Sequence, residues 1–433
     1  MDIDIIQIVT VLLGVLAMYQ FFFRNDEFLI LLLLFFIATG LLRYIAVLSG
    51  ETNWAIVAYA KDIFDLNDEL ALVALNYFLL GTATFMITYF LMYVNAPLKY
   101  KIDNQSNFNN FLMSKQKLIF ILFGIFLVLN GAIKTLLSTF ESRAFGAGYL
   151  FLFRLILGGL ILLFFLIFKN IGTKNTFYRF LYLLIIVFAG YSSYDPELRF
   201  QFLSWMIAMV FVVARDTNPL RKFWFYLAGG TVVLFIFAMA GNLRHAAIAS
   251  KPFGEQVQFA FKRIAIAEDQ NMLDGFMMVL QVYPEHLDYS LGMEHLEILM
   301  RPIPRAIWPG KPVGGYANKL GLNEGLPDGT TVGISQSIYG SFYGEGGIIG
   351  IIVFAVLYAV LFVWLFKYAN RYNSDMKYLI KGIVFASAVP LLRGGDLPGI
   401  FAFIGMSYVT IFVFLFGYNR YLLKLKKLNT KNE

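Results

Sequence analysis

The chain consists of long apolar runs separated by short polar connections. A helix needs about 20 mostly apolar residues to cross a membrane, and eleven runs meet or approach that length. They lie at 3–23, 28–48, 70–94, 118–137, 149–168, 177–193, 199–214, 223–241, 346–366, 379–395 and 399–417. Each run is continuously apolar and does not alternate, which predicts helices and not strands. We therefore expect an all-α polytopic membrane protein with about eleven transmembrane helices.

The composition agrees with this class. Of 433 residues, 59% are hydrophobic and only 15% are charged, whereas soluble domains are nearer a quarter charged. So few charged side chains could not coat the surfaces of two to four soluble domains. The chain has no cysteine, which excludes disulfides and thiolate metal sites.

Basic residues collect in alternate connections, which predicts the orientation. The connections that are rich in basic residues carry Arg24, Lys99, Lys101, Lys115, Lys117, Lys169, Lys174, Arg179, Arg215, Arg221, Lys222, Lys367, Arg371, Lys377, Lys381, Arg420, Lys424, Lys426, Lys427 and Lys431. Cytoplasmic loops of membrane proteins are enriched in Lys and Arg, so the N-terminus is predicted outside and the C-terminus in the cytoplasm. The net charge of +7 is then a sign of topology, and nucleic acid is excluded as a partner.

The runs divide the chain into four parts. Residues 1–241 hold the first eight transmembrane helices, and 242–345 form one large extracytoplasmic loop. Residues 346–417 hold the last three helices, and 418–433 form a basic cytoplasmic tail. A long loop in a compact protein is usually functional.

The large loop carries all three histidines of the chain. Between Pro252 and Tyr283 its apolar residues recur near helical spacing, which predicts amphipathic helices that rest on the membrane or cap the bundle. From Arg301 to Gly333 the loop is rich in Pro and Gly and is predicted to be irregular.

The most informative string of the loop runs from Arg301 to Pro312, where four prolines fix an extended backbone. Its cations are Arg301, Arg305 and Lys311. Guanidinium groups bind phosphate and pyrophosphate oxygens bidentately, and Trp308 could stack on a sugar or lie at the membrane interface. The alternative is a structural loop whose cations pair with acids such as Glu294 and Glu297.

Further basic residues are predicted near the outer surface. Arg244 and His245 follow the eighth run, and Arg393 lies in the Leu392-Arg-Gly-Gly-Asp396 turn between the last two runs. Arg43, Lys134 and Arg154 lie inside or near the ends of predicted helices. Intramembrane charges usually face a partner or a wet cavity, so this group fits an anionic lipid headgroup. Interfacial anchoring is the alternative for each.

Two residues are candidates for accepting a proton: His245, and Glu345 in the glycine-rich stretch before the ninth run. Glu268, Asp269 and Asp274 are further candidate bases, and Glu345 could instead pair with an arginine. The histidines lack zinc-ligand spacing, and no nucleotide-binding motif is present. We expect no metal and no cofactor.

Two motifs resemble those of a known family. Ile303-Pro-Arg-Ala-Ile-Trp-Pro-Gly-Lys-Pro312 and Gly340-Ser-Phe-Tyr-Gly-Glu-Gly-Gly-Ile-Ile-Gly350, with the helix count and the large loop, resemble the O-antigen polymerases, the Wzy-type oligosaccharide repeat-unit polymerases. The motif resemblance covers mainly residues 240–350, with the Leu392–Gly395 string in support. It implies a GT-C-like fold in the bacterial inner (plasma) membrane.

The resemblance also implies a reaction. Such enzymes transfer a growing glycan from undecaprenyl pyrophosphate to the non-reducing end of a new lipid-linked unit on the outer face. The product would be O-antigen, capsule or exopolysaccharide. Membrane lipids, a chain-length regulator and a flippase are the implied partners. On this interpretation Arg244, Arg301, Arg305, Lys311, Arg393 and Arg154 contact the substrate. An O-antigen ligase-like transferase, or a flippase without bond chemistry, is the alternative.

Overall fold

The structure, a computed structural model, is helical throughout the residues that it describes. These are 1–55, 63–93, 103–139, 147–170, 176–193, 199–215, 218–242, 248, 250–266, 271–301, 303, 307–308, 310–311, 314–322 and 334–432. The all-α fold class is therefore confirmed for this part of the chain.

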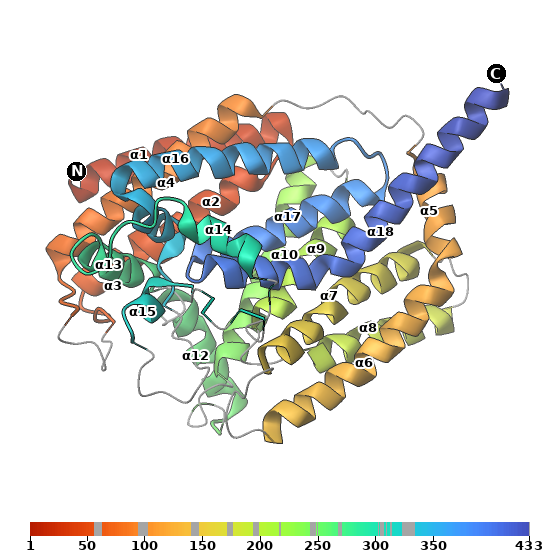
Figure 1. The fold of residues 1–433 in the computed structure, drawn as a ribbon, viewed down its shortest axis with the longest axis horizontal. Helices are drawn as coiled ribbons and strands as arrows, with labels where there is room; N and C mark the ends of the chain where they lie inside the picture. The colour runs from red at the N-terminus through yellow and green to blue at the C-terminus, as the bar shows by residue number, and fades with distance from the viewer. Residues whose placement is uncertain are drawn as a thin grey trace.

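Every predicted transmembrane run falls in a helix. These helices are α1 (Ile3–Arg24), α2 (Phe28–Phe36) with η1 (Ile37–Leu41) and α3 (Leu42–Leu48), α4 (Asp68–Met92), α6 (Gln116–Thr139), α7 (Ala147–Asn170), α8 (Thr176–Ser193), α9 (Arg199–Val213), α10 (Pro219–Asn242), α16 (Ser337–Ala369), α17 (Asp375–Arg393) and α18 (Leu397–Asn432). A short helix, α5 (Gln105–Ser114), precedes α6. The N-terminus and the C-terminus lie at opposite ends of the longest axis (Figure 1).

Seven helical segments are long and apolar enough to cross a membrane: Ile3–Arg24, Phe28–Leu48, Asp68–Met92, Gln116–Leu136, Leu152–Asn170, Ser337–Ala369 and Leu397–Leu428. The described apolar parts of α8 and α9 are shorter, and α17 carries four charged residues within its 19. The molecule is thus a polytopic membrane protein, while the count of eleven spans stays a prediction.

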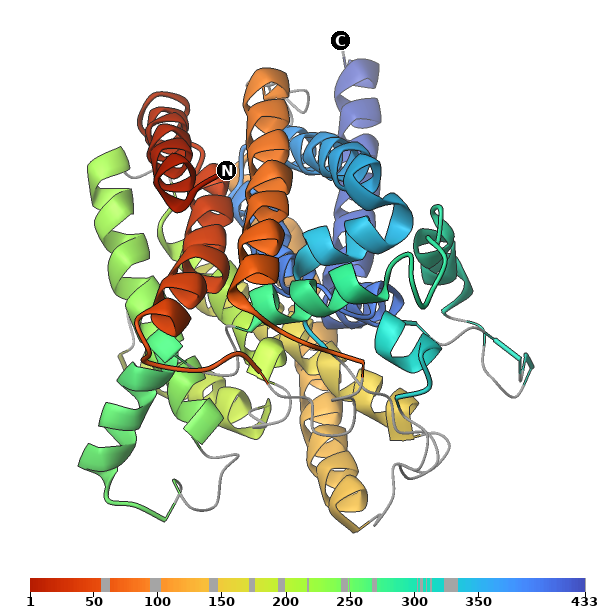
Figure 2. The same cartoon turned by 90° about the vertical axis from the view of Figure 1, so that its left-hand side faces the viewer.

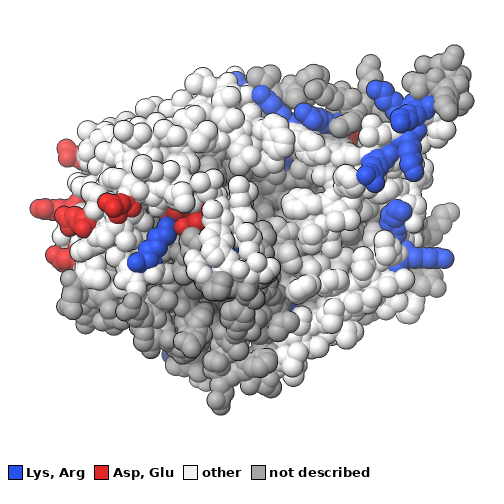
Figure 3. All heavy atoms as spheres, viewed as in Figure 1, with Lys and Arg blue, Asp and Glu red and all other residues white. Residues whose placement is uncertain are grey.

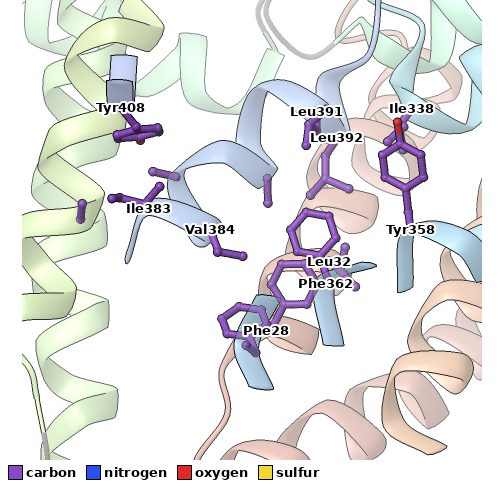
Figure 4. Packing of buried hydrophobic residues seen from close by; sticks show 14 of the residues in the cluster. Phe28, Leu32, Ile338, Tyr358, Phe362, Ile383, Val384, Leu391, Leu392 and Tyr408 are labelled. Carbon is purple, nitrogen blue, oxygen red and sulfur yellow. The ribbon is translucent and has the colours of Figure 1, made fainter. Parts of the chain in front are cut away.

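Aromatic residues of α2, α16 and α17 form the centre of the bundle. The ring of Phe28 stacks on Phe362 with centroids 4.6 Å apart, and its edge meets Phe385 at 5.8 Å. Figure 4 shows Phe28, Leu32 and Phe362 facing Val384, Leu391 and Leu392 across this core. Such stacked and edge-on pairs add to the stabilisation that burial gives.

Glycines allow two pairs of helices to approach closely. A Cβ at Gly159 of α7 would lie 2.3 Å from Oγ1 of Thr410 in α18, and one at Gly382 of α17 would lie 2.7 Å from Cα of Ala208 in α9. Small residues at crossings are the usual means by which membrane helices pack.

The two ends of the bundle differ in charge. In Figure 3 acidic residues gather at the end that carries the N-terminus and basic residues gather at the opposite end, with a largely uncharged surface between them. Cations at the basic end also bind buried acids. Lys222 Nζ lies 2.6 Å from Glu27, and Lys169 and Arg215 both contact Asp375, whose side chain is fully buried.

In the described part of the large loop, the helices before α16 are α12 (Phe253–Ile266), α13 (Met272–Val282), α14 (Met293–Met300) and α15 (Tyr316–Lys319). Viewed from the acidic end, α13 lies across the bundle and α12 lies to the lower left (Figure 2). We expected helices between Pro252 and Tyr283 that rest on the membrane or cap the bundle, and α12 and α13 lie there. Helix α13 is buried along its length except Leu280 and Gln281, because it packs between α4 and α16. The segment from Arg301 to Gly333, predicted to be irregular, includes the single turn α15.

The start of the ninth helix, predicted at residue 346, also differs from the start in the structure. Helix α16 begins at Ser337 and is broken at Gly346 and Gly347, where φ of Gly347 is +63°. Phe342 lies before the break, yet its ring is 5.5 Å from Phe354 and 5.0 Å from Tyr358. The short first half, Ser337 to Glu345, therefore folds back beside the long second half. Only glycine adopts the φ of residue 347 without strain.

Candidate functional site

The broken helix α16 and the loop helix α14 meet around Glu345. This carboxylate is 1% exposed. Its Oε1 is 2.8 Å from Nδ1 of His295, and its Oε2 accepts a hydrogen bond from the backbone N–H of Gly292. The carbonyls of Gly344 and Glu345 accept from the N–H groups of Ser290 and Leu291, each at 2.9 Å. The chain before α14 thus closes over the last turn of the first half of α16.

His295 connects Glu345 to Tyr358. With Nδ1–H donated to the carboxylate, Nε2 keeps its lone pair, and this nitrogen is 3.2 Å from the hydroxyl of Tyr358. The imidazole stacks on Phe354 with centroids 4.3 Å apart and rings inclined by 6°. Its side chain is 22% exposed, whereas that of Glu345 is fully buried. The arrangement holds a histidine in one tautomer and leaves part of it accessible.

We offered Glu345 as a proton acceptor or as the partner of an arginine, and this geometry gives it another role. Both of its carboxylate oxygens already accept hydrogen bonds, so the carboxylate orients His295. His295 is the partner that is partly exposed, with 22% of its side chain accessible, and its Nε2 lies 3.2 Å from the Tyr358 hydroxyl. Sequence reasoning passed over it because neither motif contains it.

Two further acids of α14 pair with Lys319 of α15. Its Nζ is 3.2 Å from Oε1 of Glu294 and 3.7 Å from Oε1 of Glu297. Burial raises the pKa of Glu294 to about 7, although Lys319 opposes the shift. Burial also raises the pKa of Glu297. The pairing that we offered as an alternative thus involves these acids, but with Lys319.

Arg301 lies where α14 ends and reaches the turn between the last two helices. Its Nη2 is 3.3 Å from Oδ2 of Asp396, and both side chains are about one-third exposed. Together with Glu297, Arg301 lines a small hollow that also includes Met300, Lys311, Gly314 and Pro398. Arg301 is thus partly exposed and already paired with an acid.

Lys311 was expected to present its charge to a substrate, but it is 8% exposed. Its Nζ donates to the carbonyls of Arg301 and Ile303 at 2.7 and 2.8 Å. A cation at a helix C-terminus compensates the unpaired carbonyls and the helix dipole. Lys311 therefore fastens the proline-rich string to the end of α14, while Trp308 in the same string is 37% exposed.

Arg393 occupies the last turn of α17 and is half-buried. The glycines after it allow a tight approach to α16, since a Cβ at Gly394 would lie 2.2 Å from the carbonyl oxygen of Ser337. This turn leads directly to Asp396, the partner of Arg301.

Arg154 and Arg43 take structural positions. Arg154 is 3% exposed, and its Nε donates to Oδ1 of Asn130 in α6 at 3.1 Å. Arg43 donates to both carboxylate oxygens of Asp274, at 3.0 and 2.7 Å, and both residues are buried. Asp274 also accepts from the N–H of Ala55 at 2.7 Å. This candidate base is thus fully engaged, and Arg43 is bound to a partner.

Several predicted residues lie outside the described residues: Arg244, His245, Glu268, Asp269 and Arg305. The structure makes no statement about their positions. Of the remaining candidates it brings Glu345, Arg301 and Lys311 to the two ends of α14. Within the searched part of the chain, no three His, Cys, Asp or Glu side chains are grouped as metal ligands.

These features define a polytopic membrane protein with a buried glutamate–histidine pair beside a broken helix. No protein-family model matches the chain, and neither the curated proteins nor the solved structures include one similar to it.

Proposed function

We propose that the chain is a membrane-embedded glycosyltransferase that polymerises lipid-linked oligosaccharide repeat units. In this proposal it has eleven transmembrane helices and a GT-C-like fold and lies in the bacterial plasma membrane. The N-terminus lies outside and the C-terminus in the cytoplasm. The separation of acidic and basic residues between the two ends supports this orientation.

One observation carries the proposal. The two strings that resemble the Wzy-type polymerases, 303–312 and 340–350, are separated by 27 residues of the sequence, and α14 contacts both. Its His295 bonds Glu345 of the second string, and Lys311 of the first string donates to the carbonyl of Arg301 at its end. In this proposal His295 is the proton acceptor and Arg301 the cation, and they lie near the two ends of one eight-residue helix.

The reaction follows from these two groups. The acceptor hydroxyl of the new unit donates its proton to Nε2 of His295, in the place that the Tyr358 hydroxyl occupies in the structure. Its oxygen bonds to the anomeric carbon of the growing chain. The bond from that carbon to the pyrophosphate oxygen breaks, and undecaprenyl pyrophosphate leaves with the electron pair. Arg301 and Arg393, with Arg244 and Arg305, would stabilise the charge on the leaving group.

In this mechanism Glu345 is a positioning residue, and Lys311 holds the proline-rich string. No nucleotide sugar is needed as donor. A chain-length regulator and a flippase are the partners that such a reaction would require in the cell.

The test is complementation of cells that produce the glycan and lack this chain. We expect these cells to display single repeat units only, and the intact chain to restore a ladder of lengths on a gel. His295→Ala should lower polymer synthesis roughly 10²- to 10⁴-fold, the usual contribution of general acid–base catalysis. The matched control is His286→Ala, since His286 is exposed in the same loop.

A normal ladder from His295→Ala at equal protein level would show that this histidine is structural. A full ladder in cells without the chain would refute the polymerase. Complete glycan left on its lipid carrier would indicate a ligase instead, and repeat units retained on the cytoplasmic face would indicate a flippase. A flippase would carry cations through its depth. Cations at the basic end, such as Lys222 and Lys169, instead bind buried acids.

A further inference from the structure

Helix α14 has its polar face turned toward the protein and its apolar face turned outward. The exposed positions are Met293 (46%), Leu296 (49%) and Leu299 (76%). The covered positions are Glu294 (3%), His295 (side chain 22%) and Glu297 (8%). At about 100° per residue, the three exposed positions lie on one side of the helix and the three covered positions lie on the other.

This pattern is the reverse of a helix whose outer face meets water. A surface helix buries its apolar stripe and exposes its charges, because burying an ionisable group costs free energy unless it is paired. Here the acids are the buried groups, and each is paired with a cation or a histidine. Charged residues point inward when the outer medium is hydrocarbon.

The position of α14 agrees with such a medium. It lies between α16 and α18 on the side of the bundle that faces the viewer in Figure 1, and not across its end. The imidazole of His295 stacks on Phe354, which is seven residues beyond the Gly347 break and so about 10 Å along the helix. The long half of α16 spans about 33 Å, which is the thickness of a hydrocarbon core.

The outer face of α14 also continues the exposed face of α16. Ile349 and Val353 of α16 are 74% and 45% exposed, beside the turns that His295 contacts. After α14 the chain exposes Ile303 (37%) and Ile307 (76%). Apolar exposure therefore continues from a spanning helix onto a helix of the loop.

We propose that α14 is immersed in the membrane, with Leu296, Leu299 and Ile307 in contact with the hydrocarbon chains of the surrounding lipids. The helix then forms a wall between the lipid and the Glu345–His295 pair. The inference concerns the medium outside α14 and holds whatever reaction the site performs.

The absence of cysteine in the chain allows a direct test. Single variants Leu299→Cys, Leu296→Cys, Val353→Cys and His286→Cys are labelled with the fluorophore bimane, and the protein is placed in phosphatidylcholine vesicles. Val353→Cys is the lipid-facing control and His286→Cys is the water-facing control. Quenching is then measured with brominated phosphatidylcholine and with aqueous iodide.

We expect brominated lipid to quench the label at 299 and at 296 as strongly as at 353 and several-fold more than at 286. Iodide should give the opposite order. Iodide quenching at 299 equal to that at 286 would show that α14 faces water. Weak quenching by both reagents at 299 and 296 would show a protein cover, such as a second copy, and would also overturn the proposal. The assay needs no glycan, so its outcome is separate from that of the polymerase test.

Discussion

One ring nitrogen of His295 is hydrogen-bonded to the buried carboxylate of Glu345, and the other lies 3.2 Å from the hydroxyl of Tyr358. These contacts determine what each of the three residues can do. The carboxylate of Glu345 accepts from both His295 and the Gly292 N–H, so it fixes the tautomer of the imidazole. The neighbouring acid Glu294 is also buried, and desolvation raises the pKa of its carboxyl group to about 7.

Glu294 makes the stability of the protein depend on pH. Its folded pKa of about 7 lies above the ordinary value of 4.5 for a glutamate, so the folded state binds the proton more tightly. The resulting stabilisation is full below pH 4.5 and is lost as the pH rises through 7. We expect the apparent melting temperature in detergent to fall by roughly 3 °C between pH 5.5 and 8.

Glu294→Gln keeps the shape of the side chain and removes the titration, so this fall should be reduced in the variant. Glu285→Gln changes an exposed acid of the same loop and serves as the control. An unchanged pH profile in Glu294→Gln would contradict the raised pKa.

The buried pair Arg43–Asp274 joins α3 to α13. Removing one partner leaves an uncompensated buried charge, so Arg43→Leu should destabilise the fold by about 3–5 kcal/mol. The double variant Arg43→Leu/Asp274→Leu should recover much of this loss, because neither charge remains. Thermal unfolding in detergent measures both variants, and equal destabilisation by the single and the double variant would rule out the pair as the cause.

At the scale of elements, the break in α16 and the course of α14 make the site. Gly347 lies at φ +63°, and a Cβ there would be 3.1 Å from the hydroxyl of Tyr289. The first half of α16 can fold back only because of this glycine. It thereby brings Glu345 to α14 and the Ser337 backbone to the turn after Arg393.

Gly347→Ala should therefore destabilise the protein by about 1–3 kcal/mol and lower glycan synthesis. Gly254→Ala is the matched control, because a Cβ at this position in α12 meets no atom within 4 Å. There alanine should be neutral or stabilising by up to about 1 kcal/mol. Equal stability of the two variants would show that the break does not need glycine.

Hydrophobic runs predicted the helices well, because a run of apolar residues forms a helix whatever its neighbours are. The partners of charged groups could not be predicted, because Arg43–Asp274 and Lys319–Glu294 join segments whose approach is set by packing. A helix was predicted where α13 lies, but its nearly complete burial was not. Its sequence MLDGFMMVLQV is apolar on nearly all sides, and such a pattern is typical of a buried helix.

The candidate site was predictable in part. The sequence singled out Arg301, Glu345, Arg393 and Trp308, and the structure places the first two at opposite ends of α14. It did not single out His295, whose role depends on contacts with Glu345 and Tyr358, 50 and 63 residues away. The part played by Lys311 was also hidden, because a lysine that binds carbonyls has no signature of its own.

At the scale of the whole molecule, charge is separated along the long axis and the candidate site lies off that axis. Acids mark one end, bases mark the other, and apolar surface lies between (Figure 3). A protein of this form divides two aqueous compartments.

The most direct test uses the purified protein in vesicles with one undecaprenyl-pyrophosphate-linked repeat unit from the producing cell. The polymerase account predicts a ladder of longer lipid-linked glycans and one undecaprenyl pyrophosphate released for each bond formed. His295→Ala should yield neither product, and His286→Ala should yield both. Intact repeat units and no released carrier, from folded protein under these conditions, would contradict the account.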